Sequence, residues 1–425
     1  MAQLTAEKQL TFVSPTRSRI YGVLFLVVAA AIWFMFSRTV TGAAISTFVL
    51  NLSESGTNIP DWRLPTQITL NVLAVLCAFL GGFQLARGRG FGRYSNTVLG
   101  LVAGIFIFSF LAWATADQSI SLAGLLNNTL SKAVPLTLGA LSGVLCERAG
   151  VVNIAIEGMM LSGAMVGALV GSLTGSLWIG LLCAVLVGAL LGLLHGVLSI
   201  KYMTNQIVSG TVINIFSTGI TSFISAKFLQ VYQELNNPGI FPVIEIPLLV
   251  KIPIIGPILF ANNMFVYAMF IFLVLIQVAL FYTRWGLRLR SVGEHPKAAD
   301  TLGINVFRTR YMAVILGGMM AGFAGGYFTL GSVGRFDEVM TAGRGFISLA
   351  AMIFGNWMPF GSFGAGLLFG FADSLASKLA ILGVRIPSQF LLMLPYIATM
   401  VILAGVVGRG QMPAADGEPY KKESV

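Results

Sequence analysis

Long hydrophobic stretches recur along this chain, and short polar, basic or proline-rich stretches separate them. An α-helix of about 20 apolar residues covers the roughly 30 Å hydrocarbon core of a bilayer. One such stretch is compatible with a signal peptide or a buried helix, but a dozen are not. The sequence therefore predicts twelve hydrophobic passes, at residues 20–36, 68–86, 96–115, 122–145, 152–172, 176–198, 205–226, 264–283, 311–330, 344–358, 361–382 and 387–408.

Two stretches depart from this pattern. Residues 344–358 are too short for a comfortable crossing, so they either cross the membrane or re-enter it as a half-helix. Residues 227–263 are apolar but contain five prolines, which exclude a continuous helix. We expect this loop to lie along the membrane surface or to cap an external opening.

Composition supports the membrane interpretation. Hydrophobic residues make up 56% of the chain and charged residues only 10%, against about 25% charged residues in soluble proteins. The net charge of +10 does not indicate nucleic-acid binding, because the basic residues flank the hydrophobic stretches. With the N-terminus inside, the inner loops hold 17 Lys and Arg residues and the outer loops 7. This bias predicts a multi-pass protein of the cell membrane with both termini in the cytoplasm.

The predicted fold class is an all-α polytopic membrane protein, a bundle of about 10–12 transmembrane helices with broken or re-entrant segments. Glycine-rich runs such as Gly317–Gly318 and Gly322–Gly326 predict close helix packing. The three cysteines and two histidines are too far apart for a metal site, and we expect no cofactor.

The loop at residues 284–310 carries the clearest functional signal. Pro296 suits the first turn of a short helix, and Gly303 suits its end. Ala298 and Ala299 would leave a small, flat face between them. Such an element is suited to docking into a groove on a soluble partner. The alternative is an ordinary basic loop that only fixes the topology.

Three ordered motifs resemble a known family. Gly293–Ile304 (GEHPKAADTLGI) is similar to the coupling-helix motif of ABC importer permeases, in the branch that imports ribose-type sugars and nucleosides. Glu147–Met160 resembles the Arg-x-Gly-x-x-Asn-Ile-x-x-Glu-Gly signature of that branch, and Ala350–Gly364 resembles a late glycine-rich motif of its nucleoside-type members. The resemblance implies a permease core at residues 121–409. Residues 1–120, with three predicted passes, are an N-terminal extension, and residues 410–425 are expected to be a disordered cytoplasmic tail.

The resemblance implies the transmembrane permease subunit of an ATP-driven importer, with nucleosides as its expected substrate. Expected partners are a cytoplasmic ABC ATPase, a second permease subunit in a heterodimer, an extracellular substrate-binding lipoprotein and membrane lipid, but no nucleic acid. The chain lacks the G-x-x-x-x-G-K-[ST] loop, so we expect a transport subunit that is not itself an enzyme. The resemblance assigns the ATPase contact to Gly293, Glu294, His295, Pro296, Ala298, Ala299, Gly303 and Ile304.

Polar groups at membrane depth are costly and mark functional sites. The substrate-pathway candidates are Asn153, Glu157, Asn214, Phe216 and Asn356, with Asn205, Gln206, Phe223 and Asp373 as further members of this set. An amide side chain can donate to and accept from a sugar hydroxyl or a base edge, and a phenylalanine can stack on a base. The alternative is an interhelical hydrogen bond for each asparagine, and a pairing of Glu157 with Arg148 or the backbone.

Three other functions stay open on the sequence. The first is a permease of the same type for a monosaccharide such as ribose or galactose. The second is a secondary transporter, although the sparse charge at membrane depth (Lys132, Glu157 and Asp373) argues against it. The third is a membrane scaffold without transport activity.

Overall fold

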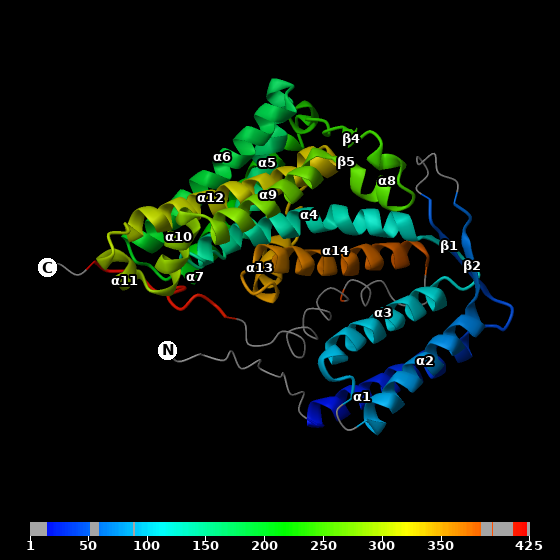
Figure 1. The fold of residues 1–425 in the computed structure, drawn as a ribbon. Coiled ribbons are helices and arrows are strands. Elements are labelled where there is room, and N and C mark those ends of the chain that lie inside the picture. The colour runs from blue at the N-terminus through cyan, green and yellow to red at the C-terminus, as the bar shows by residue number, and fades with distance from the viewer. Residues whose placement is uncertain (1–14, 52–58, 88–89, 384–392, 394–410, 423–425) are drawn as a thin grey trace, which may run out of the picture. The chain divides into compact units, whose positions relative to one another are not determined.

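The structure is a computed structural model that describes residues 15–51, 59–87, 90–383, 393 and 411–422. Helices dominate it (Figure 1), and ten of those in the described residues are long and apolar enough to cross a membrane. Contacts divide the chain into two units, one of Met1–Ala123 and Leu379–Arg385 and one of Gly124–Lys378 and Ile386–Val425. The predicted all-α membrane fold is confirmed. The predicted pass at residues 387–408 lies outside the described residues.

The first unit holds three of the predicted passes. Its helices are α1 (Pro15–Ala31, continued by the turns η1, Ile32–Phe36, and η2, Ser37–Thr39), α2 (Thr66–Ala86) and α3 (Ser95–Ala114, after the turn η3, Gly92–Tyr94). Strand β1 (Ile45–Val49) pairs antiparallel with β2 (Trp62–Pro65) and parallel with β3 (Ser119–Ser121). Ser46 at the centre of β1 hydrogen-bonds Thr66 at 2.6 Å and the Ala112 carbonyl oxygen at 2.6 Å, which joins the sheet to α2 and α3.

The second unit begins within α4 and is built around α5, α6 and α12. Its long helices are α4 (Leu122–Glu147), α5 (Ile156–Thr174), α6 (Leu177–Gly196, extended by η4, Val197–Lys201), α7 (Gln206–Ile224, extended by η5, Ser225–Leu229), α9 (Met264–Tyr282), α12 (Val306–Gly326, extended by η8, Tyr327–Val333) and α14 (Pro359–Ile381). The unit also contains the short helices α8 (Ile255–Phe260), α10 (Arg284–Glu294), α11 (Pro296–Thr301) and α13 (Arg344–Phe354).

The proline-rich loop is irregular, as predicted. It consists of η6 (Gln233–Asn236), β4 (Val243–Glu245), η7 (Leu249–Lys251), α8 (Ile255–Phe260) and β5 (Ala261–Asn263), with β4 and β5 paired antiparallel. The next helix then starts at an asparagine cap, because the Asn263 side chain accepts from Phe265 N–H at 3.1 Å. Asn205 and Asn305 cap α7 and α12 in the same way.

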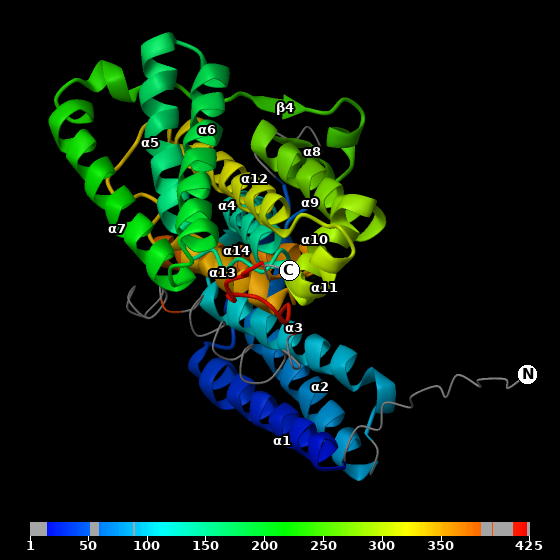
Figure 2. The ribbon, with the colours of Figure 1, turned by 90° about the vertical axis from the view of Figure 1, so that its left-hand side faces the viewer.

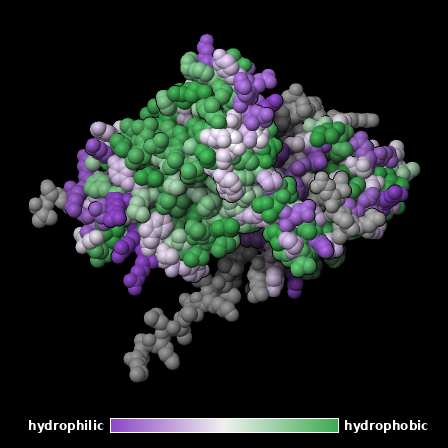
Figure 3. Space-filling view, turned by 90° about the horizontal axis from the view of Figure 1, so that it is seen from above, coloured by the Kyte–Doolittle hydropathy of each residue, from purple (hydrophilic) through white to green (hydrophobic). Residues whose placement is uncertain are grey.

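Hydrophobic side chains cover much of the face shown in Figure 3, and hydrophilic side chains gather at its left edge, the end at which α10 and α11 lie in Figure 1. On α6, large apolar side chains point outward at four-residue intervals: Trp178, Leu182, Leu186 and Leu190. A helix face this apolar is stable against lipid but not against water.

Glycines bring the central helices into backbone contact. A Cβ atom on Gly188 of α6 would lie 2.8 Å from Gly322 Cα of α12, and one on Gly318 would lie 3.0 Å from Gly192 Cα. A Cβ atom on Gly163 of α5 would lie 2.7 Å from the Gly322 carbonyl oxygen. The glycine runs in α12 therefore serve close packing, as the sequence predicts.

We expect Gly318→Ala to destabilise the protein by about 1–3 kcal/mol, because the added methyl group overlaps backbone atoms that have no room to move. Unfolding of the purified protein in detergent measures this loss. The matched control is Gly219→Ala in α7, where nothing lies within 4 Å of the new Cβ atom. Equal stability of the two variants would contradict the packing argument.

Candidate functional site

The loop after α9 folds into two short helices. Thr283 caps α10 by accepting from Gly286 N–H at 3.1 Å, and Pro296 occupies the first turn of α11. Gly303 has φ +80°, a left-handed conformation that glycine adopts without strain, and it ends α11 as predicted. Figures 1 and 2 both place α10 and α11 at one end of the second unit.

The sequence predicts that Ala298 and Ala299 form a flat, exposed face, but only one of the two is exposed in the structure. Ala298 is exposed, but Ala299 is only 2% exposed and packs with Val292, Val306 and Tyr420. Ala299 therefore packs α11 onto the protein and presents almost no surface of its own. Leu302, 81% exposed, stands at the tip beside the exposed Gly303 instead.

Of the other motif residues, Gly293 is buried against the backbone of Arg148 and Gly150, and Glu294 and His295 are exposed. Pro296 and Ile304 are partly buried. The motif thus contributes both the anchor of the loop and its exposed tip.

Residues 411–422 pack against this same loop, although their composition predicts disorder. Ala415 N–H donates to the Gly293 carbonyl oxygen at 2.9 Å, and Arg310 donates to the Glu418 carbonyl oxygen at 2.8 Å. The Tyr420 ring lies 5.5 Å from that of Phe307, centroid to centroid. This tail is held by hydrogen bonds to its backbone and by a ring contact, and the polar composition of the segment does not predict such contacts.

A non-helical break at residues 151–155 separates α4 from α5, and side chains satisfy its backbone. Gln206 accepts from Val152 N–H at 2.7 Å, and His195 meets the Val152 carbonyl oxygen at 2.9 Å. Asn214 donates to the Ile154 carbonyl oxygen at 2.9 Å and accepts from Gly158 N–H at 2.8 Å. Both ends of the Asn214 amide are therefore used within the protein.

Asn153 is fully buried in the break. Its side-chain oxygen accepts from Ala155 N–H at 3.1 Å, and its nitrogen faces the sulfur atoms of Cys146 and Met159 at 3.5 and 3.8 Å. Phe216 and Phe223 lie on the outer face of α7, 54% and 59% exposed. These aromatic side chains do not meet Asn214, whose side chain is buried.

Glu157, in the first turn of α5, holds the start of α13. Its carboxylate accepts from the Thr341 hydroxyl at 2.6 Å, Gly343 N–H at 2.9 Å and Gly345 N–H at 2.5 Å. A carboxylate at a helix N-terminus satisfies free N–H groups and complements the helix dipole. Of the two alternatives for Glu157, the backbone pairing is the one observed.

The short pass at residues 344–358 connects the two ends of the second unit. Before it, Phe336 exchanges two hydrogen bonds with Asn236, at 2.7 and 2.9 Å, at the end where α7 finishes. At its end, Trp357 donates to Glu147 at 2.6 Å, where the unit carries α10 and α11. The chain therefore passes through the unit, first without helix and then as α13.

A group of charged residues lies at mid-span and is partly exposed. Lys132 of α4 contacts Asp373 of α14 at 3.1 Å, and Arg344 contacts the same carboxylate oxygen at 3.8 Å. Lys132 also donates to the Ser377 hydroxyl at 2.6 Å. Charges at this depth require protein or water beside them.

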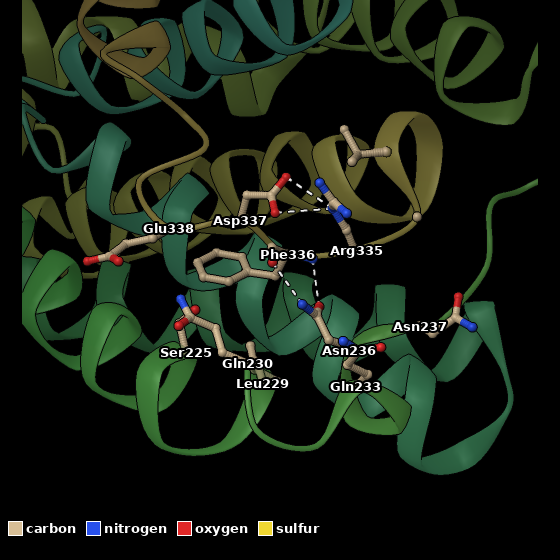
Figure 4. A pocket seen from close by; sticks show the side chains of 12 residues that line it. Ser225, Leu229, Gln230, Gln233, Asn236, Asn237, Arg335, Phe336, Asp337 and Glu338 are labelled. Carbon is tan, nitrogen blue, oxygen red and sulfur yellow. Dashed lines mark hydrogen bonds and ion pairs between the residues drawn. The ribbon is translucent and has the colours of Figure 1, made fainter.

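A polar pocket of about 560 Å³ lies at the far end of the unit from α10 and α11. Figure 4 shows its walls, which come from the end of α7, from η6 and from the segment after α12. They include Gln230, Gln233, Arg335, Asp337 and Glu338, and Arg335 pairs with Asp337 at 3.1 Å. The sequence analysis did not find this pocket, because its walls come from two segments, residues 225–237 and 333–338, that lie far apart in the chain.

Comparison with known proteins gives these features a context. The family model described as "Branched-chain amino acid transport system / permease component" matches residues 125–407. The chain belongs to this family. No solved structure gives a significant match.

Several curated relatives span the same core. The chain is 42% identical over 303 residues to the guanosine ABC transporter permease protein of Bacillus subtilis, covering 69% of this chain and 95% of that protein. It is 40% identical to the nucleoside ABC transporter permease protein NupC of Lactococcus lactis, covering 69% and 96%. A relative from Haloferax volcanii, provisionally named a glucose ABC transporter permease, is 32% identical, covering 71% and 98%. In this transporter family the ATPase is a separate subunit.

We expect Glu157→Ala to destabilise the protein by at least about 2 kcal/mol, because it leaves three donors without their charged acceptor. Protease sensitivity of residues 341–354 should rise with the loss of stability. The control, Glu338→Ala, removes an exposed carboxylate and should leave both readouts unchanged. An unaltered Glu157→Ala protein would show that α13 does not need this cap.

The tail should be released as the pH rises. Burial raises the pKa of Asp416 from an ordinary 3.8 to about 7, beside Glu147 and Arg310. The docked tail therefore favours the protonated acid, so this contribution is complete below about pH 4 and is lost as the pH rises towards 7. Hydrogen exchange of residues 411–422, expressed as the ratio to Asp416→Asn at each pH, should show increasing exposure over this range. A constant ratio would exclude the acid as its cause.

Proposed function

We propose that this chain is one permease subunit of an ATP-driven importer of nucleosides. The observation that supports this most strongly is the similarity to two relatives named for guanosine and nucleoside transport, over 95% and 96% of their lengths. The exposed tip of α11 is suited to contact with an ATPase subunit, and the polar pocket at the opposite end is suited to contact with a substrate-binding protein.

The ATPase subunit is proposed to bind at the tip of the α10–α11 loop. Leu302 and Ala298 are exposed there, while Gly293 and Ala299 fix the loop to α12 and to the α4–α5 connection. A protruding helix anchored in this way transmits a push into the bundle, because packed helices move as units. The excess of Lys and Arg in the loops on the same side as this loop supports the proposal that both termini lie in the cytoplasm.

The polar pocket is proposed to receive the substrate-binding protein. Its amide and carboxylate side chains suit the polar rim of a transient interface. The nucleoside would then pass along the face that holds Lys132, Arg344 and Asp373, with a second permease subunit closing the other side. Glu157 and Asn214 act on this path by holding its broken segments in place, and Asn356 accepts from Gln411 N–H at the inner end.

The substrate is tested in proteoliposomes that contain the whole importer. We expect ATP-dependent uptake of radiolabelled guanosine that excess uridine or adenosine reduces and that ribose or galactose does not. Competition by ribose or galactose alone would favour the monosaccharide alternative. Uptake that a proton or sodium gradient drives without ATP would favour a secondary transporter.

We expect Leu302→Arg to abolish co-purification of the ATPase subunit and ATP-dependent uptake, because a charged side chain replaces the apolar tip of the loop. The matched control is Leu248→Arg, which changes a leucine that is 78% exposed at the other end of the unit. This control should retain the ATPase. Full ATPase binding by Leu302→Arg would place the contact elsewhere.

A further inference from the structure

Two neighbouring cavities beside α9 and α12 share one residue, Trp285. The first, the apolar groove, has a volume of about 370 Å³ and only apolar side chains in its wall. They are Leu145, Val185, Phe272, Leu275, Ile276, Ala279, Trp285, Leu316, Met319, Met320 and Phe323. The second, the basic cleft, has a volume of about 860 Å³ and lies between α10, the segment after α11 and the start of α12.

The basic cleft is suited to an anion. Arg288 and Arg308 line it together with the polar residues Ser291, Asn305 and Thr309, and the described residues of its wall include no acidic side chain. Among the described residues, neither guanidinium forms an ion pair or a side-chain hydrogen bond. An arginine without such a partner can bind phosphate oxygens through paired N–H groups of its guanidinium.

The groove has the length of one leaflet. Phe272 is the first α9 residue in the wall of the groove, and helix α9 continues for ten residues from there to its end at Tyr282. At about 1.5 Å per residue this distance is about 15 Å, half of the roughly 30 Å hydrocarbon core. The groove therefore reaches from mid-membrane to the level of Trp285, where the basic cleft begins. A tryptophan at that position is typical of the membrane–water interface.

We propose that the groove and the cleft together bind one anionic phospholipid. An acyl chain occupies the apolar groove, and the phosphate of the headgroup lies between Arg288 and Arg308. A soluble anion would occupy the cleft and leave the groove empty, and a soluble protein partner could not reach the apolar groove within the bilayer. An amphipathic molecule of leaflet length matches both cavities.

The cleft also includes Leu302, Gly303 and Ile304, which belong to the α10–α11 loop. A lipid bound there contacts the loop from its membrane side, opposite the buried Ala299. The lipid would thus support the position of the loop relative to the bilayer. This role does not depend on which substrate the protein carries.

The test uses the full chain, purified in mild detergent and stripped of lipid, with phosphatidylglycerol and phosphatidylcholine as probes in native mass spectrometry. We expect phosphatidylglycerol to bind more tightly than phosphatidylcholine. The variant Arg288→Gln/Arg308→Gln should lose about 30-fold in affinity for phosphatidylglycerol and little for phosphatidylcholine. The matched control, Arg284→Gln/Lys421→Gln, removes two exposed charges outside both cavities and should bind as the wild type does.

Two further measurements separate the alternatives. Glycerol phosphate, which has the anion without the acyl chains, should not displace the lipid, and a photoactivatable acyl chain should label residues 272–285 or 312–323 of the unmodified protein. Equal binding of both lipids, displacement by glycerol phosphate, or labelling elsewhere would overturn the proposal. Loss of ATPase binding in the arginine variant with lipid binding intact would instead make the cleft part of the protein interface.

Discussion

Backbone N–H and C=O groups at membrane depth need partners inside the protein, because lipid offers none. In the described residues of the second unit, polar side chains take over the lost backbone bonds at two of the places where the helices are interrupted. At the start of α13, one hydroxyl and two backbone N–H groups donate to the Glu157 carboxylate. In the break before α5, backbone N–H and C=O groups bond to the side chains of Asn214, Gln206 and His195. The polar residues that cost most to bury are thus the residues that hold the irregular segments.

This role links the fold to transport. A straight bundle of unbroken helices packs too regularly to open and close at a defined place. The non-helical stretch before α13 and the break before α5 are fixed by a few directional bonds, and they lie between the loop at one end and the polar pocket at the other. On the proposed function, a push on α10 and α11 would reach the break before α5 through Gly293, which lies against the backbone of Arg148 and Gly150.

Hydropathy predicted the long helices well, because a membrane-spanning helix needs a continuous apolar stretch and little else. The predicted pass at 205–226 corresponds to α7 with η5, and that at 264–283 to α9. The polar residues at membrane depth were also found, since each is a rare exception in an apolar stretch. Their partners were not predictable, because Thr341, Gly343 and Gly345 lie more than 180 residues from Glu157. The polar pocket and the ordered tail were missed for the same reason.

The packing of the last described residues against α10 and α12 has a consequence for how the protein is made. The chain is synthesised from its N-terminus, so Ala415 and Tyr420 leave the ribosome after every helix that they brace. Until then, Gly293 and Phe307 lack these contacts. The surface that we assign to the ATPase subunit is therefore supported only after residues 415–420 have been synthesised, and a translation product that stops before them offers the ATPase an unsupported loop.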